Sequence, residues 1–151
     1  MKPQVERARA AGRDGKLKAV LWYQGESDSD CASKAEQYTA RLRQLISAVR
    51  TELGLPLPFI IVLVSISCVD RFPFVQRIRE AQQTVARDTE HVLCVDARGL
   101  PMQSDGLHLT LEAQCTLGER IAIAWWQYSC KHSSAGRRAS VITETPFQGT
   151  V

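Results

Sequence analysis

The chain has 151 residues, of which 44% are hydrophobic and 23% are charged. This length is typical of a single domain, and the composition excludes a disordered, collagen-like or coiled-coil chain. A net charge of +3 is too small to indicate nucleic-acid binding by itself. The most apolar run, 57–66, is far shorter than the ~20 residues that a membrane-spanning helix needs. We therefore expect a globular protein whose partners include neither nucleic acid nor a membrane.

The cysteines and the first residues bear on the compartment and on metal binding. The sequence has 5 cysteines, an odd number, and none of them forms a CxxC pair. This pattern predicts reduced thiols and no zinc site. The first residues contain no apolar segment of the kind found in a secretory signal. From these features we predict a cytoplasmic protein that uses neither a metal ion nor another cofactor.

Helical and strand patterns alternate along the chain. In order, the sequence predicts a helix at 3–11, a strand at 18–23, a helix at 33–53, a strand at 59–64, a helix that Pro73 opens, a strand at 91–96, and a last helix that Thr110 caps. This alternation predicts a parallel sheet with helices on both faces. Three strands are few for such a sheet, and a helix comes first, so we expect that N-terminal strands are missing. We assign 1–130 to this partial domain and 131–151, which has few large apolar residues, to a disordered tail.

One polar cluster follows the third predicted strand, and ligands of open α/β sheets bind beyond the carboxyl ends of the strands. The spacing of Asp105 and His108 allows the carboxylate to accept a hydrogen bond from the imidazole Nδ1–H. Such a bond leaves Nε2 free to act as a general base. An isolated D-x-x-H is more often an ordinary turn with a surface histidine. This pair alone therefore leaves both interpretations open.

A second polar segment, Gln24-Gly25-Glu26, follows the first predicted strand. A Gln side chain at a strand end can donate its amide N–H to an oxyanion, and Gly allows a close approach of the backbone. The alternative is a polar loop that caps the next helix.

Trp22 and Tyr23, just before this segment, fit either a pocket wall or the core, and the core is the commoner place for strand aromatics. We also expect the apolar stripe of the last helix to lie in the core.

Four segments, in this order, carry a resemblance to a known family: 19–28 (AVLWYQGESD), 79–82 (REAQ), 94–100 (CVDARGL) and 104–110 (SDGLHLT). Together they resemble the sialate O-acetylesterase domain of the SGNH hydrolase superfamily. Within it they are most similar to plant carbohydrate esterases grouped with the acetylxylan esterases of carbohydrate esterase family 6. The resemblance covers about 5–128 and implies a flavodoxin-like, three-layer α/β/α sandwich with a mostly parallel sheet. It also implies deacetylation of sugars through a serine acyl-enzyme, with an acetylated carbohydrate as the substrate.

The resemblance also implies roles for the two polar clusters. By motif, His108 matches the general base and Asp105 matches the acid that orients it. Gln24, with the backbone of Gly25, matches part of the oxyanion hole. Glu26 matches a motif residue that buttresses the site. The REAQ segment matches a family segment for which the sequence indicates no role.

The nucleophile of the family lies in a G-Q-S-N motif, which this chain lacks. Ser27, Ser29 and Ser104 are nearby hydroxyls, but none lies on a recognisable nucleophile turn, so the nucleophile is unknown. Without a nucleophilic serine no acyl-enzyme forms. Two hypotheses remain. The first is a carbohydrate O-acetylesterase whose segment with the nucleophilic serine is absent from this chain. The second is a non-catalytic module that binds sugar or protein. Absent first strands would leave a central strand at the sheet edge, so a protein partner that supplies a strand is a further expectation.

Overall fold

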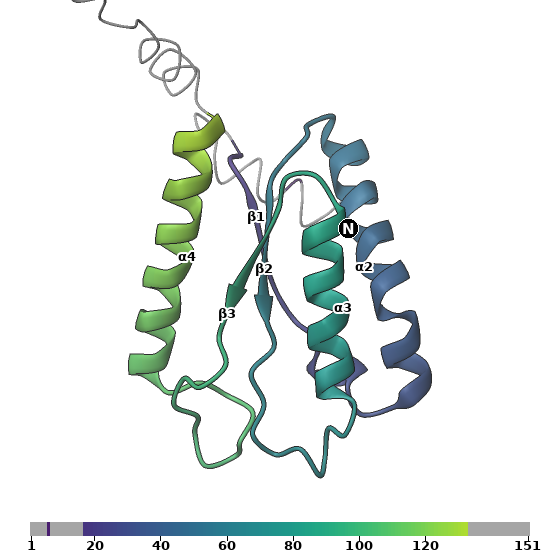
Figure 1. Cartoon of the computed structure of the whole chain (residues 1–151), viewed down its shortest axis with the longest axis vertical. Coiled ribbons are helices and arrows are strands. Elements are labelled where there is room, and N and C mark those ends of the chain that lie inside the picture. Colours follow the sequence, from purple (N-terminus) through teal and green to yellow (C-terminus); the bar gives the residue numbers. More distant parts are fainter. Residues whose placement is uncertain (1–5, 7–16, 133–151) are drawn as a thin grey trace, which may run out of the picture.

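A parallel sheet forms the centre of the molecule, whose computed structural model describes residue 6 and residues 17–132. Its strands are β1 (Val20–Tyr23), β2 (Phe59–Leu63) and β3 (Val92–Asp96), in the order β1-β2-β3 (Figure 1). Both pairings are parallel. Strand order therefore follows chain order, and each connection crosses from one strand to its neighbour through a helix.

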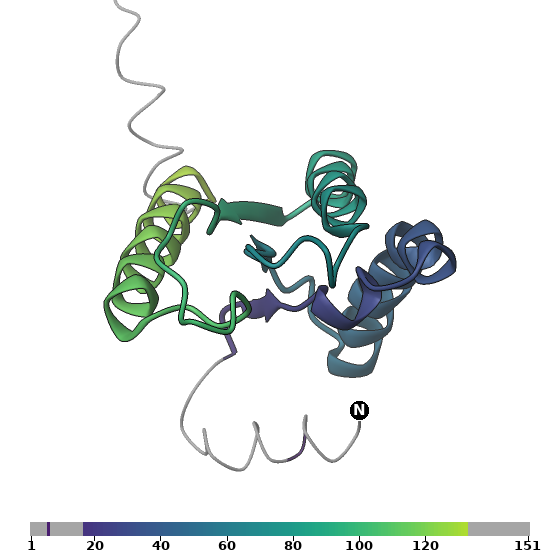
Figure 2. The same ribbon diagram turned by 90° about the horizontal axis from the view of Figure 1, so that it is seen from below.

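The helices form the two outer layers. Helices α2 (Ala32–Leu53) and α3 (Val75–Asp88) lie on one face of the sheet, and α4 (Leu111–His132) lies on the other (Figure 2). A short 3-10 helix, η1 (Glu26–Asp28), follows β1 inside the predicted polar loop. The predicted three-layer α/β sandwich with a parallel sheet is confirmed. None of the described helices is long and apolar enough to cross a membrane.

The core lies on both faces of β2. All residues of this strand are buried, because β1 and β3 flank it and helices cover both of its faces. Alternate side chains point to opposite faces, so Phe59 and Ile61 pack toward α2 and α3. Ile60 and Val62 pack in a second cluster with residues of α4. The continuous apolar run of the sequence is thus explained by a strand that is covered on both sides.

Several elements begin or end at residues other than those predicted. His91 has a φ of 57°, which side-chain-bearing residues rarely adopt, so β3 begins one residue later than predicted. The helix that Pro73 was expected to open begins at Val75. The last helix continues to His132, two residues into the predicted tail. The imidazole ring of His132 stacks on Tyr128, and its Nδ1 lies 2.8 Å from the backbone oxygen of Tyr128. These two contacts extend the last turn of the helix.

Two predicted segments lie largely outside the described residues. Of the helix at 3–11, only Glu6 is described, and it is helical. Of the tail at 131–151, only Lys131 and His132 are described, and both belong to α4.

The apolar stripe of α4 is less buried than predicted. Only Ala113 and Leu117 of this helix are buried. Ile121, Ala124 and Trp125 pack against the core but are only partly covered, and Gly118 is exposed. The prediction that the whole stripe lies in the core is therefore wrong. The reason is an uncovered space between α4 and β1, which is lined by Tyr23, Leu117 and Ile121 among others.

Arg50, near the end of α2, joins the amino ends of β2 and β3. Its Nε donates to Leu57 O at 3.0 Å, and one terminal nitrogen donates to Glu90 O at 2.8 Å and His91 O at 3.2 Å. One planar guanidinium thus satisfies three backbone carbonyls that precede the strands.

We predict that Arg50→Lys lowers the free energy of unfolding by about 1–2 kcal/mol, because an ammonium group cannot reproduce the fork of donors. Urea unfolding followed by circular dichroism measures this change. Arg43→Lys is the matched control: Arg43 makes an exposed ion pair with Asp88 at 3.2 Å, and such pairs contribute about 0–1 kcal/mol. Equal losses in both variants would contradict the bracing role of Arg50.

Candidate active site

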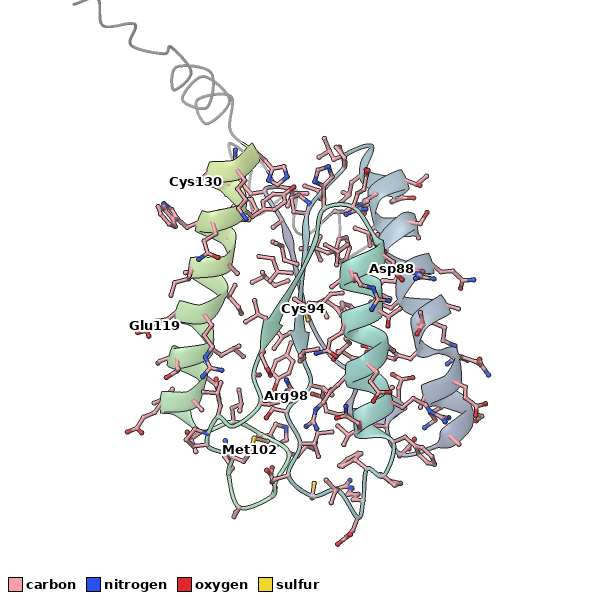
Figure 3. The ribbon with its side chains drawn as sticks, in the orientation of Figure 1. Asp88, Cys94, Arg98, Met102, Glu119 and Cys130 are labelled. Carbon is pink, nitrogen blue, oxygen red and sulfur yellow. The ribbon has the colours of Figure 1, made fainter. Side chains whose placement is uncertain are left out.

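The polar segments of the sequence gather at one edge of the sheet. Because the strands are parallel, their carboxyl ends meet there, and each continues into a loop at the bottom of Figure 1. Figure 3 places Arg98 and Met102 at this end and Cys130 at the other. The loop after β3 carries Asp105 and His108, and the loop after β1 carries Glu26. The candidate site is therefore at the carboxyl edge, as expected for an open α/β sheet.

Asp105 and His108 form a hydrogen-bonded pair. Asp105 Oδ2 lies 2.6 Å from His108 Nδ1, while Asp105 Oδ1 accepts the backbone N–H groups of Leu107 at 2.9 Å and His108 at 3.0 Å. The hydrogen bond with the imidazole, followed by those with the backbone, holds the pKa of this carboxyl well below its usual range. Asp105 is therefore ionised at neutral pH and can only accept a hydrogen bond from Nδ1–H.

Gly106, inside this turn, fixes the loop against the segment after β2. Its carbonyl accepts the backbone N–H of Ser67 at 2.9 Å. The φ of Gly106 is 64°, and a Cβ there would lie 2.8 Å from Ser67 Oγ and 3.2 Å from Cys68 Cβ. Only glycine fits a left-handed conformation with so little space. The D-G-L-H spacing is therefore set both by its own turn and by contact with the neighbouring loop.

His108 opens into a hollow of about 490 Å³ between the end of β1 and α4. Tyr23 and Glu26 line the same hollow, together with Leu107, Leu109, Gln114, Leu117, Gly118 and Ile121. Tyr23 is 40% exposed, so its place is the pocket wall and not the core. Burial, and then the Glu26 carboxylate, raises the pKa of the Tyr23 phenol, which therefore keeps its proton at neutral pH.

The proposed oxyanion donors are already occupied. Gly25 N–H donates to Glu26 Oε2 at 2.9 Å, and Gln24 Nε2 donates to Asp28 Oδ2 at 2.7 Å. The Gln24 side chain lines a different hollow, of about 130 Å³, on the α2 side of the sheet. The structure thus brings Glu26 and His108 to one hollow and places the Gln24 side chain elsewhere. An oxyanion role for Gln24 and Gly25 stays a prediction.

Gln82, to which the sequence assigned no role, holds the loop after β1 to the end of β2. Its side chain is fully buried. Its Oε1 accepts the N–H of Val64 at 3.1 Å, and its Nε2 donates to Gln24 O at 2.9 Å. Tyr38 donates to the same Gln24 oxygen at 2.8 Å. These contacts fix the backbone at which the Q-G-E segment leaves the sheet.

Arg79, in the same REAQ segment, binds backbone carbonyls that follow β2. Its Nε donates to Val64 O at 2.8 Å, and a terminal nitrogen donates to Ile66 O at 3.4 Å. Desolvation by burial lowers the pKa of its guanidinium. Only the resemblance pointed to these two residues, because a contact partner far along the chain leaves no mark in local periodicity.

The candidate hydroxyls do not reach His108. Ser29 is buried and donates to Glu26 O at 2.7 Å, while Ser27 and Ser104 are exposed. None of the three lines the hollow of His108. Within the described part of the chain, the one hydrogen bond to the imidazole of His108 is that with Asp105. The nucleophile therefore stays unassigned.

Cys94 does not replace the missing nucleophile. Cys94 lies midway along the sheet, away from the loops of the carboxyl edge (Figure 3). Although it is exposed at the outer edge of β3, its surroundings desolvate the thiol and, with Asp96, raise its pKa to about 11. A thiol with this pKa is a weak nucleophile at neutral pH. Cys31, Cys68, Cys94 and Cys115 form no disulfide.

The described residues include no group of three or more His, Cys, Asp or Glu side chains that could hold a metal ion.

Comparison with known proteins identifies the family. Residues 2–127 match the family of carbohydrate esterases described as sialic acid-specific acetylesterases. The chain belongs to this family. It is 42% identical over 131 residues to a probable carbohydrate esterase of Arabidopsis thaliana, covering 86% of this chain and 47% of that protein. The predicted resemblance, including the similarity to a plant carbohydrate esterase, is confirmed.

Solved structures agree with this assignment. An X-ray structure of an Arabidopsis thaliana protein matches with a TM-score of 0.73 and 41% identity, over 83% of this chain and 50% of that one. The crystal structure of NanS matches with a TM-score of 0.68 and 17% identity, over 86% of this chain and 52% of that one. The latter likeness shows the shared fold. The chain spans about half the length of these relatives.

We predict that Gln82→Met lowers the free energy of unfolding by about 1–3 kcal/mol, because it leaves the buried Val64 N–H without an acceptor at nearly unchanged volume. Urea unfolding measures this loss. Gln83→Met, at the exposed neighbouring position of α3, is the control and should change stability by less than about 0.5 kcal/mol. An unchanged urea midpoint in Gln82→Met would show that the hydrogen bonds of the Gln82 side chain do not stabilise the fold.

We also predict a pH-dependent effect of Asp105→Asn. A carboxyl whose folded pKa is depressed adds stability above its unfolded pKa of about 3.9 and loses it as the pH falls below that value. The difference in unfolding free energy between wild type and Asp105→Asn should therefore be constant above about pH 5 and shrink below about pH 4. Urea unfolding over a pH series tests this. Asp70→Asn, in the exposed loop after β2, is the control, and a difference that grows toward acid would contradict the prediction.

Proposed function

We propose that this chain provides the acid–base side of a carbohydrate O-acetylesterase, with His108 as the general base and Asp105 as the residue that orients it. The observation that carries the proposal is the 2.6 Å contact between Asp105 Oδ2 and His108 Nδ1, at the mouth of a hollow beyond the carboxyl ends of the strands. Membership of a carbohydrate esterase family supports an acetylated carbohydrate as the substrate.

The proton arrangement follows from the ionised carboxylate. Because Asp105 can only accept, the proton of a neutral imidazole lies on Nδ1, and Nε2 keeps its lone pair. The side chain of His108 is 67% exposed, so Nε2 is accessible to a hydroxyl or a water molecule. The pair can take a proton from an attacking oxygen and return it to the sugar oxygen that leaves.

The hollow has the chemistry of a sugar site. Apolar residues of α4 form one wall, while the Tyr23 phenol and the Glu26 carboxylate offer a donor and an acceptor for sugar hydroxyls. In this proposal the backbone N–H of Gly25 contributes an oxyanion donor, whereas the Gln24 side chain lines the other hollow. Gly25 N–H becomes available when the Glu26 carboxylate that it now binds turns toward the substrate.

A second candidate function is a non-catalytic, sugar-binding module. The observation in its favour is that no hydroxyl or thiol of the described residues donates to His108 Nε2. In that case Tyr23, Glu26 and His108 bind an acetylated sugar without cleaving it.

Acetate release from a panel of O-acetylated sugars separates the two candidates. A positioned general base contributes about 10²–10⁴-fold to a rate, so His108→Ala should lower acetate release by a factor in this range. Asp105→Asn should cause a smaller loss, because it leaves the imidazole in place without its orienting charge.

His91→Ala is the matched control, since His91 lies at the amino end of β3, away from the carboxyl edge. It should leave the rate unchanged. Equal release by wild type and His108→Ala would overturn the esterase proposal. Binding of the intact sugar in that case, detected by calorimetry and lost in Glu26→Ala, would establish the second candidate.

A further inference from the structure

The hollow of His108 carries negative charge. Glu26 supplies a carboxylate to its wall, and none of the described residues that line it is a lysine or an arginine. Next to the imidazole, the Asp105 carboxyl is ionised as well. Leu117 and Ile121 make the opposite wall apolar. A cleft with charges of one sign and walls of low polarity concentrates the electric field, so an anion that enters this hollow is repelled.

The Tyr23 phenol shows which charge dominates in this space. Burial raises its pKa, and the Glu26 carboxylate raises the pKa further, whereas the backbone of Ser65 and the Arg79 guanidinium lower it. The effect of Glu26 is larger than that of Arg79. Tyr23 therefore lies in a net negative potential, and it lines the same hollow as His108.

The arginines of the carboxyl edge bind other partners. Arg79 donates to two backbone carbonyls that follow β2, at 2.8 Å and 3.4 Å. Arg98 donates to both carboxylate oxygens of Asp96, and Arg120 donates to the backbone oxygen of Asp96 at 2.7 Å. None of the three lines the hollow. A carboxylate bound there would lose water without gaining a cation, which is unfavourable.

The hydrogen-bonding groups of the hollow also match a neutral sugar. Gln114 Nε2 donates to Leu109 O at 3.1 Å, so the oxygen of this side chain is the group that a ligand can use. With the Glu26 carboxylate, the hollow thus offers acceptors to the hydroxyl protons of a sugar. A carboxylate on the sugar has no proton to donate, because an ionised carboxyl group only accepts.

We propose that Glu26 determines the charge specificity of this site: it favours acetyl esters of neutral sugars over those whose ring carries a carboxylate. The inference rests on the function proposed above, because it takes the hollow as the sugar site. With the ester at His108, the sugar ring lies between His108 and Glu26. A carboxylate on that ring is then within the screening length of about 10 Å at 0.1 M salt, so Glu26 repels it.

The test measures binding of two sugars that differ in one group. The probes are a methyl glucoside and a methyl glucuronoside, each with an acetamide in place of the O-acetyl group, so that neither is hydrolysed. Dissociation constants come from magnetic-resonance titrations of the full chain. At low ionic strength the neutral probe should bind about three- to tenfold more tightly than the acidic one. At 1 M salt, where the screening length falls to about 3 Å, the ratio should approach one.

Glu26→Gln is the decisive variant. It removes the charge but keeps an oxygen that can accept from Gly25 N–H and from a sugar hydroxyl. The acidic probe should bind about three- to tenfold more tightly than it does to wild type, while the affinity for the neutral probe changes little. If Glu26 only stabilised the loop, both affinities would fall together and their ratio would stay the same, which would overturn the proposal.

Glu80→Gln is the matched control. Glu80 is an exposed residue of α3, which covers the face of the sheet opposite α4 (Figure 2). This variant changes the net charge of the chain by the same amount, but it should leave the ratio of the two affinities unchanged. An equal shift in Glu80→Gln and Glu26→Gln would assign the effect to overall charge and overturn the role of Glu26.

The outcomes separate this inference from the proposed function. Discrimination in binding that Glu26→Gln removes, without acetate release from O-acetylated sugars, would support the charge specificity and overturn the esterase. Equal binding of both probes by wild type, or tighter binding of the acidic one, would overturn the charge specificity alone. Binding of neither probe would overturn the hollow as a sugar site and the specificity with it.

Discussion

The carboxyl edge of this protein depends on the buried carboxamide of Gln82. This side chain satisfies a backbone donor after β2 and a backbone acceptor after β1, which are 18 and 58 residues away along the chain. The Gln24 oxygen also accepts from the Tyr38 hydroxyl, and the low local polarity strengthens each of these hydrogen bonds. The position of the Q-G-E segment, and with it the hollow that Glu26 shares with His108, follows from this contact.

Arg79 and Arg50 stabilise the two ends of the same sheet in the same way. Arg79 donates to the carbonyls that follow β2, and Arg50 donates to those that precede β2 and β3. Strands of four or five residues leave many backbone groups at their ends without ladder partners. Long guanidinium side chains from α2 and α3 reach these groups, so the covering helices position the strands by more than apolar packing.

The sequence alone predicts much of the fold and one half of the site. Buried strands such as β2 leave continuous apolar runs, and the D-G-L-H turn is local, so both are visible in the order of residues. The roles of Gln82 and Arg79 were not predictable, because they depend on contacts with distant segments. The start of β3 was missed because His91 adopts a backbone conformation that its residue type does not indicate. The sequence left Tyr23 open between the core and a pocket wall and wrongly placed the α4 stripe in the core, because periodicity indicates which face is apolar, but not whether anything covers it.

The Asp105–His108 pair has a consequence for how this site is monitored. Both partners belong to one turn, in which Asp105 accepts two backbone N–H groups of the turn itself, while Gly106 holds the turn against the loop after β2. The pair thus forms between neighbours in the chain, whereas its alignment with Tyr23 and Glu26 depends on β1 and the loop that follows this strand. A magnetic-resonance signal from the proton between the two side chains reports that the turn is folded, and it would persist in a molecule whose sheet edge is misassembled. The presence of this signal therefore does not show that the whole candidate site is correctly folded. A probe of the whole site has to report on the distance between β1 and α4.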